Sequence, residues 1–207
     1  ATRGISERVA WATASLGADV DEEVGRVTRH VTHDLPRGAL QGANIQDAKL
    51  DGANLEAADL QGANLQGADL REANLEGTKL QGANLRDANL QGTNLSGCDL
   101  RGANLKGVDL SGKTLTDGNL QGADLRGLQI EDVSIEKANL QGCSLQDARL
   151  KDVSLEKANL QGANLHGASL TEVSFEKANL QGCNLHQSVI SKSSLEKANL
   201  RGANLHG

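Results

Sequence analysis

The chain has 207 residues, with 24 glycines, one tryptophan (Trp11), one phenylalanine (Phe175) and neither tyrosine nor methionine. Its apolar residues are almost all leucine and alanine, which predicts a narrow, regular interior and not an aromatic globular core. The formal charge of −6 comes from interleaved acidic and basic residues. This pattern disfavours direct nucleic-acid binding, and the given sequence contains no apolar run typical of a membrane span.

Residues 1–37 differ from the rest of the chain and are predicted to contain a short α-helix. Asp19 is placed as its N-cap, and a shorter helix is expected before Gly17. This segment can cap the first coil of a repeat stack or dock onto a partner, and both alternatives stay open. Four valines share one face of the predicted helix, namely Val20, Val24, Val27 and Val31.

From Leu40 to Leu205 every fifth residue is leucine, isoleucine or phenylalanine, at 34 positions without an insertion. A small residue, mostly alanine, stands two residues before this central residue, and glycine stands two residues after it at 19 of the 34 positions. Residues two apart share one face of an extended segment, and glycine permits the positive φ of a type II turn. Each five-residue unit is therefore predicted to be a short inward-packed side followed by a corner.

A second period of 20 residues is superimposed on the first. The stretch "VSLEKANLQG" at residues 153–162 is nearly repeated at 133–142, 173–182 and 193–202. Twenty residues are four units, so one coil should have four sides, with equivalent residues of successive coils stacked in columns. Parallel β crossovers favour right-handed winding. Residues 38–207 therefore predict an all-β solenoid of about 8.5 coils.

Stretches such as "ANLQGADL" at residues 63–70 resemble the pentapeptide-repeat family, whose motif is A(D/N)LXX. The resemblance covers residues 38–207 and implies a right-handed quadrilateral parallel β-helix. Some members of that family imitate duplex DNA and bind type II topoisomerase. Those members carry a markedly acidic surface, loop insertions and a C-terminal dimerisation element, and residues 38–207 show none of these features. Other members are cyanobacterial or plastid-type regulators.

Three columns supply the candidate surface residues. A glutamate column beside a lysine column can dock a partner of complementary charge or form a solvated face. A histidine column, in line with Arg86, Lys106 and Arg126, can form a pH-sensitive basic strip or ordinary surface. Zinc is not expected there, because parallel side chains on a flat face diverge. The residues are Glu136, Lys137, Glu156, Lys157, Glu176, Lys177, Glu196, Lys197, His166, His186 and His206.

Two further columns are predicted to form amide ladders, in which stacked side chains hydrogen-bond to one another. One is mostly glutamine and begins at Gln41, and the other runs from Asn119 to Asn199.

The cysteines all occupy the small inward position, as Cys98, Cys143 and Cys183. Cys143 and Cys183 lie two coils apart, which exceeds the reach of a disulfide. Buried, reduced thiols favour the cytoplasm or another reducing compartment, and import into an organelle stays open.

Departures from the pattern concentrate between residues 113 and 130. Lys113, Gly118 and Leu128 replace the small inward residue there. A lysine at an inward position must reach out to solvent or bend the coil. A local bulge and a recognition feature are both open interpretations of this stretch.

These observations favour a non-catalytic rigid rod without a cofactor, which serves as a protein-interaction or structural module of a larger assembly. The alternatives are a DNA-mimicking inhibitor or protector of a type II topoisomerase, and a regulator of the cyanobacterial or plastid type. Because an open coil exposes unpaired backbone groups, end-to-end association is also expected at the last coil, near Leu195, Leu200 and Leu205.

Overall fold

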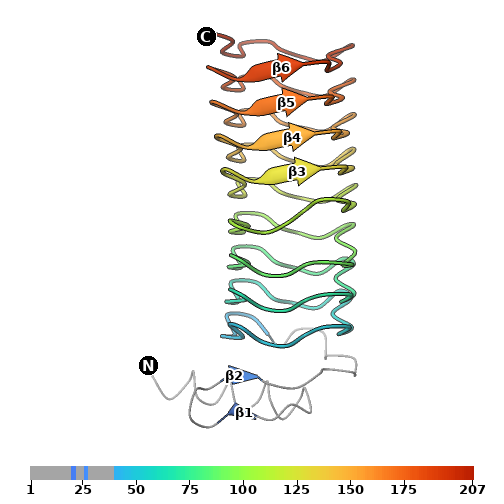
Figure 1. The fold of residues 1–207 in the computed structure, drawn as a ribbon, viewed down its shortest axis with the longest axis vertical. Helices are drawn as coiled ribbons and strands as arrows, with labels where there is room; N and C mark the ends of the chain where they lie inside the picture. Colours follow the sequence, from blue (N-terminus) through green and yellow to red (C-terminus); the bar gives the residue numbers. More distant parts are fainter. Residues whose placement is uncertain (1–19, 22–25, 28–39) are drawn as a thin grey trace.

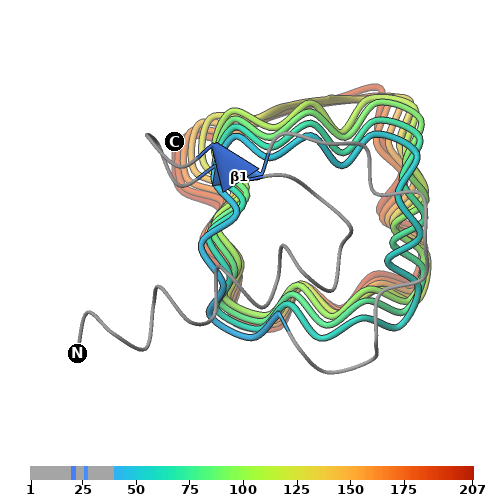
Figure 2. The ribbon, with the colours of Figure 1, turned by 90° about the horizontal axis from the view of Figure 1, so that it is seen from below.

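The computed structural model describes residues 20–21, 26–27 and 40–207. From residue 40 onward the chain winds into coils that lie one above another and form a straight rod (Figure 1). Seen along its axis, the rod has a square outline with four sides (Figure 2). The predicted four-sided β-solenoid is confirmed.

A turn closes each five-residue unit. In the first one, the Ala43 N–H donates to the Leu40 carbonyl over 3.0 Å, and equivalent bonds recur along the rod. The residue two places after each central residue has a positive φ at all 34 positions, at 19 glycines and 15 other residues. Lys157, with φ of 59°, accepts this conformation at a cost of about 1 kcal/mol. Hydrogen bonds to the next coil fix the corner, so glycine is favoured there but not required.

The coils are joined in a register of 20 residues. Parallel bridges link Asn44 to Asn64 and Asn64 to Asn84. Backbone bonds follow the same register, because the Leu65 N–H donates to the Asn84 carbonyl over 2.8 Å. The 20-residue period of the sequence is therefore one complete coil.

Four short strands stand above one another in the C-terminal half of the rod (Figure 1). They form a parallel sheet in the order β3-β4-β5-β6, with partners 20 residues apart. In the first three strands the middle residue is buried and its two neighbours are more exposed, as expected for one side of a coil that packs on the core. The strands are β3 (Gln129–Glu131), β4 (Arg149–Lys151), β5 (Ser169–Thr171) and β6 (Val189–Ser191).

The core is a continuous stack of leucine and alanine along the rod. Ala163 and Leu165 are both fully buried, and the single phenylalanine, Phe175, is 1% exposed. The inward assignment of the small and the central residue is thus confirmed.

The N-terminal helix is not found. Two strands, β1 (Val20–Asp21) and β2 (Arg26–Val27), pair antiparallel where the helix was predicted. The sequence explains the error, because β-branched valines favour strands and Gly25 weakens a helix interior by about 1 kcal/mol. The shorter helix before Gly17 falls outside the described residues. A capping or docking role for residues 1–37 stays a prediction.

The predicted asparagine ladder is present. The Asn159 Nδ2 donates to Asn139 Oδ1 over 3.3 Å, and the Asn179 Nδ2 donates to Asn159 Oδ1 over 3.1 Å. The same Asn159 oxygen also accepts the Gln161 N–H at 3.2 Å. Asn199 is the last member of the ladder, and its Nδ2 donates to Asn179 Oδ1 over 3.0 Å. Each interior asparagine therefore bonds to the coils on both sides.

Replacing Asn159 with alanine should destabilise the rod by about 1–3 kcal/mol, because two amide rungs and an acceptor for a backbone N–H are lost. Asn199→Ala removes one rung and the acceptor of the Arg201 N–H, so it should cost less by the worth of one rung. Urea unfolding of both variants tests this prediction. Equal costs for the two would show that the ladder adds nothing to stability.

The prediction of a glutamine ladder is mostly wrong. Among the described residues one glutamine rung is formed, from Gln121 Nε2 to Gln141 Oε1 at 3.4 Å. In the first three coils the amide of Gln41, Gln61 and Gln81 reaches an aspartate, as where Gln81 Nε2 donates to Asp99 Oδ2 over 2.6 Å. A carboxylate is a stronger acceptor than an amide oxygen, so these glutamines donate to aspartate and not to the stacked glutamine.

The three cysteines are free and buried. The Cys98 thiol donates to the Leu75 carbonyl over 2.9 Å, and the Cys183 thiol donates to the Leu160 carbonyl over 2.8 Å. Burial raises the pKa of Cys98 and of Cys143 to about 12, and that of Cys183 to about 11. The reducing compartment stays a prediction.

We expect the native thiols to resist alkylation at pH 8, because the thiolate is the reactive form and these pKa values lie far above that pH. Iodoacetamide followed by peptide mapping should find the three sites unmodified, and fully modified in denaturant. A Val189→Cys variant is the control, because Val189 is 63% exposed. Native labelling of any of the three at the rate of the control would contradict the burial.

Candidate functional site

The glutamate and lysine columns lie side by side and neutralise each other. Lys157 Nζ lies 2.6 Å from Glu156 Oε1, and Lys177 Nζ lies 2.6 Å from Glu176 Oε1 and 3.9 Å from Glu156 Oε1. The hydrogen bond from Lys157 lowers the pKa of Glu156, and the bond to Glu176 raises the pKa of Lys177.

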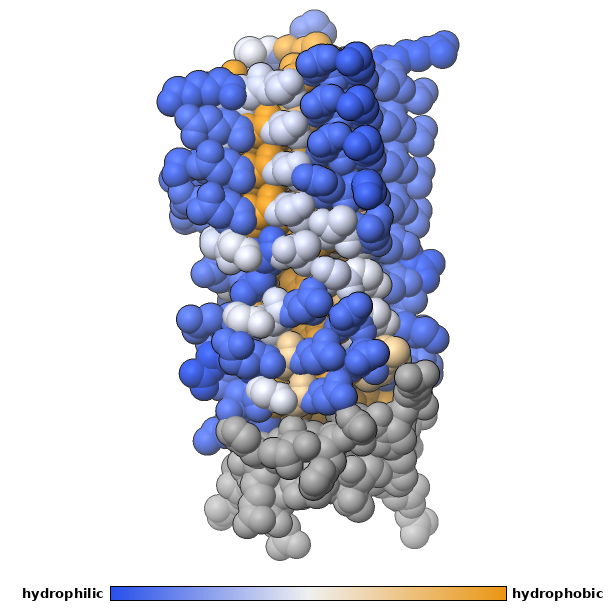
Figure 3. All heavy atoms as spheres, turned by 90° about the vertical axis from the view of Figure 1, so that its right-hand side faces the viewer, coloured by the Kyte–Doolittle hydropathy of each residue, from blue (hydrophilic) through white to orange (hydrophobic). Residues whose placement is uncertain are grey.

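At the ends of these columns the glutamates are also bound. Lys197 pairs with Glu196 at 2.8 Å, and Glu136 accepts the Ser154 hydroxyl at 2.9 Å. Figure 3 shows hydrophilic rows running along one side wall, interrupted about halfway up by residues of intermediate hydropathy. The columns form a self-compensated surface, and partner binding by them stays a prediction.

Two rings of the histidine column stack on each other. The His166 and His186 rings are 5.2 Å apart at their centroids and 19° from parallel. His186 Nδ1 lies 2.7 Å from the His206 carbonyl oxygen. Within the described residues no group of three or more histidine, cysteine or acidic side chains is arranged to hold a metal ion. The absence of bound zinc stays a prediction.

The residues predicted for the end interface lie at the last coil. Leu195 and Leu200 are partly buried against the core, whereas Leu205 is 58% exposed. Association through this end stays a prediction. Among the residues that the structure describes, no helix has the length and apolar character needed to cross a membrane.

The backbone ladder between neighbouring coils is broken next to β3. Just beyond it the ladder is regular, since the Gly127 N–H donates to the Gln146 carbonyl over 2.9 Å and the Arg149 N–H donates to the Leu128 carbonyl over 2.8 Å. One coil earlier, three equivalent bonds are absent from residues 40–207. They are the bonds from Gly107 N–H to Arg126 O, from Gln129 N–H to Val108 O and from Leu110 N–H to Gln129 O.

The break is short and closed at both ends. On one side the Leu105 N–H donates to the Asp124 carbonyl over 3.2 Å, and on the other the Gly112 N–H donates to the Glu131 carbonyl over 3.0 Å. Asp109 also forms no bridge with the preceding coil in the described part of the chain. The segment 107–110 is therefore separated from both neighbouring coils.

Side-chain size explains the break. At this inward column alanine is the usual residue, as in Ala68 and Ala148, but Val108 and Leu128 succeed one another here and both are buried. A leucine next to a valine needs more space than two alanines, and the backbones separate here, whereas the valines Val153 and Val173 of another column stay joined by the Ser174 N–H and the Val153 carbonyl at 2.9 Å. Lys113 adds to this effect because it occupies an inward position and is only half-buried.

The departure predicted for residues 113–130 therefore exists, but it begins earlier, because within the described residues the N–H groups of Leu90, Gly92 and Leu95 also lack their partners in the next coil. The signal that the sequence analysis missed is Val108, which precedes Leu128 by one coil. The structure supports a local opening of the coil at this place. Recognition of a partner by this stretch stays a prediction.

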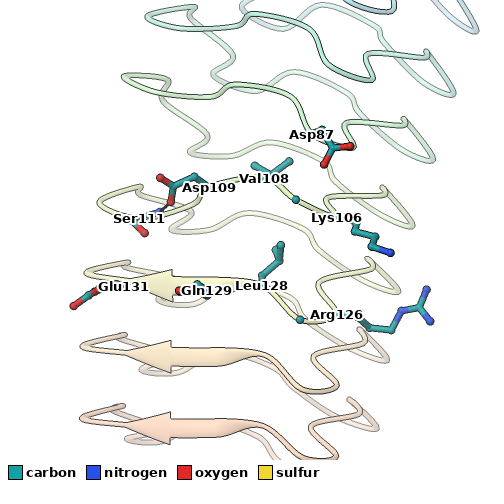
Figure 4. Close-up of a pocket in the computed structure, with 11 residues that line it drawn as sticks. Asp87, Lys106, Val108, Asp109, Ser111, Arg126, Leu128, Gln129 and Glu131 are labelled. Carbon is teal, nitrogen blue, oxygen red and sulfur yellow. Dashed lines mark hydrogen bonds between the residues drawn. The ribbon is translucent and has the colours of Figure 1, made fainter.

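The opening forms a groove of about 580 Å³ on the side of the rod. Val108 and Leu128 lie between its two ends, and Leu128 points toward the segment of Val108 (Figure 4). Lys106 and Arg126 lie at one end, and Ser111, Asp109 and Glu131 lie toward the other (Figure 4). The groove thus has an apolar middle and charged ends.

Most charges that line the groove already have partners. Arg126 binds Asp124 through two hydrogen bonds of 2.8 and 2.7 Å, and this contact holds the pKa of Asp124 below its ordinary value. Asp87 pairs with Arg86 at 3.1 Å.

The remaining carboxylates are also satisfied. Glu131 pairs with Lys151. The Ser111 N–H donates to Asp109 Oδ1 over 2.9 Å, and hydrogen bonds from Ser111 lower the pKa of Asp109. In the described region, Lys106 forms no ion pair within 4.0 Å. Lys106 and Asp109 are thus the groove charges without an ion-pair partner in the described region, and they lie toward opposite ends of the groove.

A four-sided parallel solenoid of five-residue units is the class of protein that this fold defines. A family model described as pentapeptide repeats matches residues 40–77, 68–107, 78–117 and 93–127, and a pentapeptide repeat region model matches residues 128–205. The chain therefore belongs to the pentapeptide-repeat family.

Several solved structures are similar to this chain. HetL, a pentapeptide repeat protein involved in heterocyst differentiation regulation in the cyanobacterium Nostoc, is 29% identical over 83% of this chain and 88% of its own, with a TM-score of 0.48. QnrB1, a plasmid-mediated fluoroquinolone resistance protein, is 20% identical over 86% and 88%, with a TM-score of 0.48.

A pentapeptide repeat protein of the Arabidopsis thaliana thylakoid lumen is 32% identical over 53% of this chain and 73% of its own, with a TM-score of 0.36. A search of curated proteins found no match to this chain.

Proposed function

We propose that this chain is a rigid, non-catalytic interaction module whose partner binds the side of the rod. The observation that carries the proposal is the hydrogen-bonded stack of coils, which holds surface columns in fixed positions from residue 40 to residue 207. A rigid surface loses little conformational entropy on binding, which favours recognition. Repeat solenoids use such extended surfaces for protein contacts.

The charge pattern favours this function over DNA mimicry. A mimic needs a continuous acidic surface, whereas Glu156 and Glu176 are paired with lysines of the same coil. Arginines likewise pair with Asp69 and Asp99. No specific observation favours a regulator of the cyanobacterial or plastid type over a general interaction module.

Affinity capture from cells that naturally express the chain tests the proposal. The tagged rod should retain a defined protein that an excess of untagged rod displaces. A second bait carries alanine at Lys137, Lys157, Lys177 and Lys197, to learn whether the charged columns take part. If neither bait retains any protein that the untagged rod displaces, the interaction function is wrong.

A further inference from the structure

We propose that the groove between residues 106–111 and 126–131 binds a short, extended, acidic segment of a partner protein. In this arrangement a carboxylate of the segment lies at Lys106 and Arg126. The inference rests on the proposed function, since it names the place and the chemistry of one partner contact.

The backbone of the groove matches that of a peptide. Gly107, Leu110 and Gln129 lack the inter-coil partners that their N–H groups have elsewhere in the rod, and the carbonyls of Val108, Arg126 and Gln129 lack theirs. The two walls therefore offer both donors and acceptors along one line. An extended peptide presents the same alternation, and it binds exposed strand edges in this way.

The dimensions suit one short segment. Between its corner turns the first wall is the three residues 108–110, which is about 10 Å at roughly 3.3 Å per residue. Because the coils are bonded again at Leu105 and at Gly112, the groove is closed at both ends. It can therefore be entered only from the side of the rod, by a segment that lies along it.

The apolar middle adds a requirement for the side chains of the segment. Val108 and Leu128 form this middle part of the lining. In an extended segment alternate side chains point to the same face, so one aliphatic residue can face the edges of Val108 and Leu128, which are 3% and 5% exposed, while its neighbours face solvent. The favoured segment thus alternates aliphatic and polar residues.

Charge selects an acidic residue. Lys106 forms no ion pair within 4.0 Å in the described region, and Figure 4 places it on the same side as Arg126. Arg126 uses its Nε and Nη2 for Asp124, which leaves further N–H donors for a second carboxylate. The acidic groups at the other end are already bound, to Ser111 and to Lys151. A carboxylate placed at the Lys106 end therefore meets two cationic side chains, one of them without an ion-pair partner in the described part of the chain.

The first test titrates the complete chain, labelled with ¹⁵N, with three capped heptapeptides. They alternate valine and threonine and carry one terminal aspartate, asparagine or lysine. The aspartate peptide should shift the amides of Gly107, Leu110 and Gln129 and bind most tightly. Lys106→Ala should weaken it by about tenfold, as loss of a hydrogen bond between charged groups does. Lys79→Ala, an exposed lysine outside the groove, should leave the affinity within about twofold.

The peptide titration can overturn the inference in two ways. Equal shifts by the three peptides would remove the acidic specificity, and shifts confined to other columns, or none, would exclude the groove. Affinity capture with a Lys106→Ala, Arg126→Ala bait then separates this inference from the proposed function. Loss of a partner that the wild-type rod retains supports the groove. Retention of the same partner by this bait contradicts the groove and leaves the interaction function intact.

Discussion

Replacing Ala163 with aspartate is expected to destabilise the rod by about 3–5 kcal/mol, which is the usual cost of an uncompensated buried charge. Ala163 is fully buried, and its core surroundings are leucine, alanine and the two cysteines of its own column, Cys143 and Cys183. The new carboxylate would find no cation there. Thermal or urea unfolding measures the cost, with Gln161→Glu as the control because it adds a charge to the same coil at a partly exposed position.

The pH dependence of this variant gives an independent check. Burial raises the pKa of a carboxyl group, so the folded variant binds a proton that the unfolded chain, with a pKa of about 3.9, still releases. The deficit in stability relative to wild type should therefore shrink as the pH falls toward 4. A near-neutral effect of Ala163→Asp at pH 7 would contradict the inward assignment.

Leu165→Ala should cost about 2–5 kcal/mol, because it removes a fully buried side chain and leaves a cavity in a core that cannot collapse freely. The coils above and below Leu165 are fixed by backbone bonds, such as the one from the Leu165 N–H to the Asn184 carbonyl at 2.7 Å. Leu205→Ala is the matched control. Leu205 occupies the same column two coils later but is 58% exposed, so its loss should cost less than about 1 kcal/mol. Similar costs for the two substitutions would mean that the leucine column is not a packed core.

The solenoid could be predicted because its information is local and repeated. A period of five residues marks the corners, and a period of 20 marks the coil, so even a single anomalous unit cannot shift the register. Residues 1–37 lack this redundancy. The spacing of Val20 and Val27 suits one helix face, but β-branched side chains also favour the strand pairing that the structure shows.

The groove was only partly predictable. Leu128 and Lys113 stood out as single departures, yet valine at position 108 is an ordinary inward residue here, as Val153 shows. The opening depends on the pair of Val108 and Leu128 in successive coils. The electrostatic character of the site depends on which charges find partners, and that follows from side-chain geometry and not from spacing.

Amide hydrogen exchange tests most directly the central claim, that the rod is a bonded stack of coils whose backbone ladder is interrupted at the groove. The amides of Leu65, Leu145 and Leu165, which donate to the next coil at 2.7–2.8 Å, should exchange slowly in the free protein. Those of Gly107, Leu110 and Gln129 should exchange at least about a hundredfold faster, because they lack such partners. Equal protection of both sets would show that the ladder continues through this level and that no groove exists.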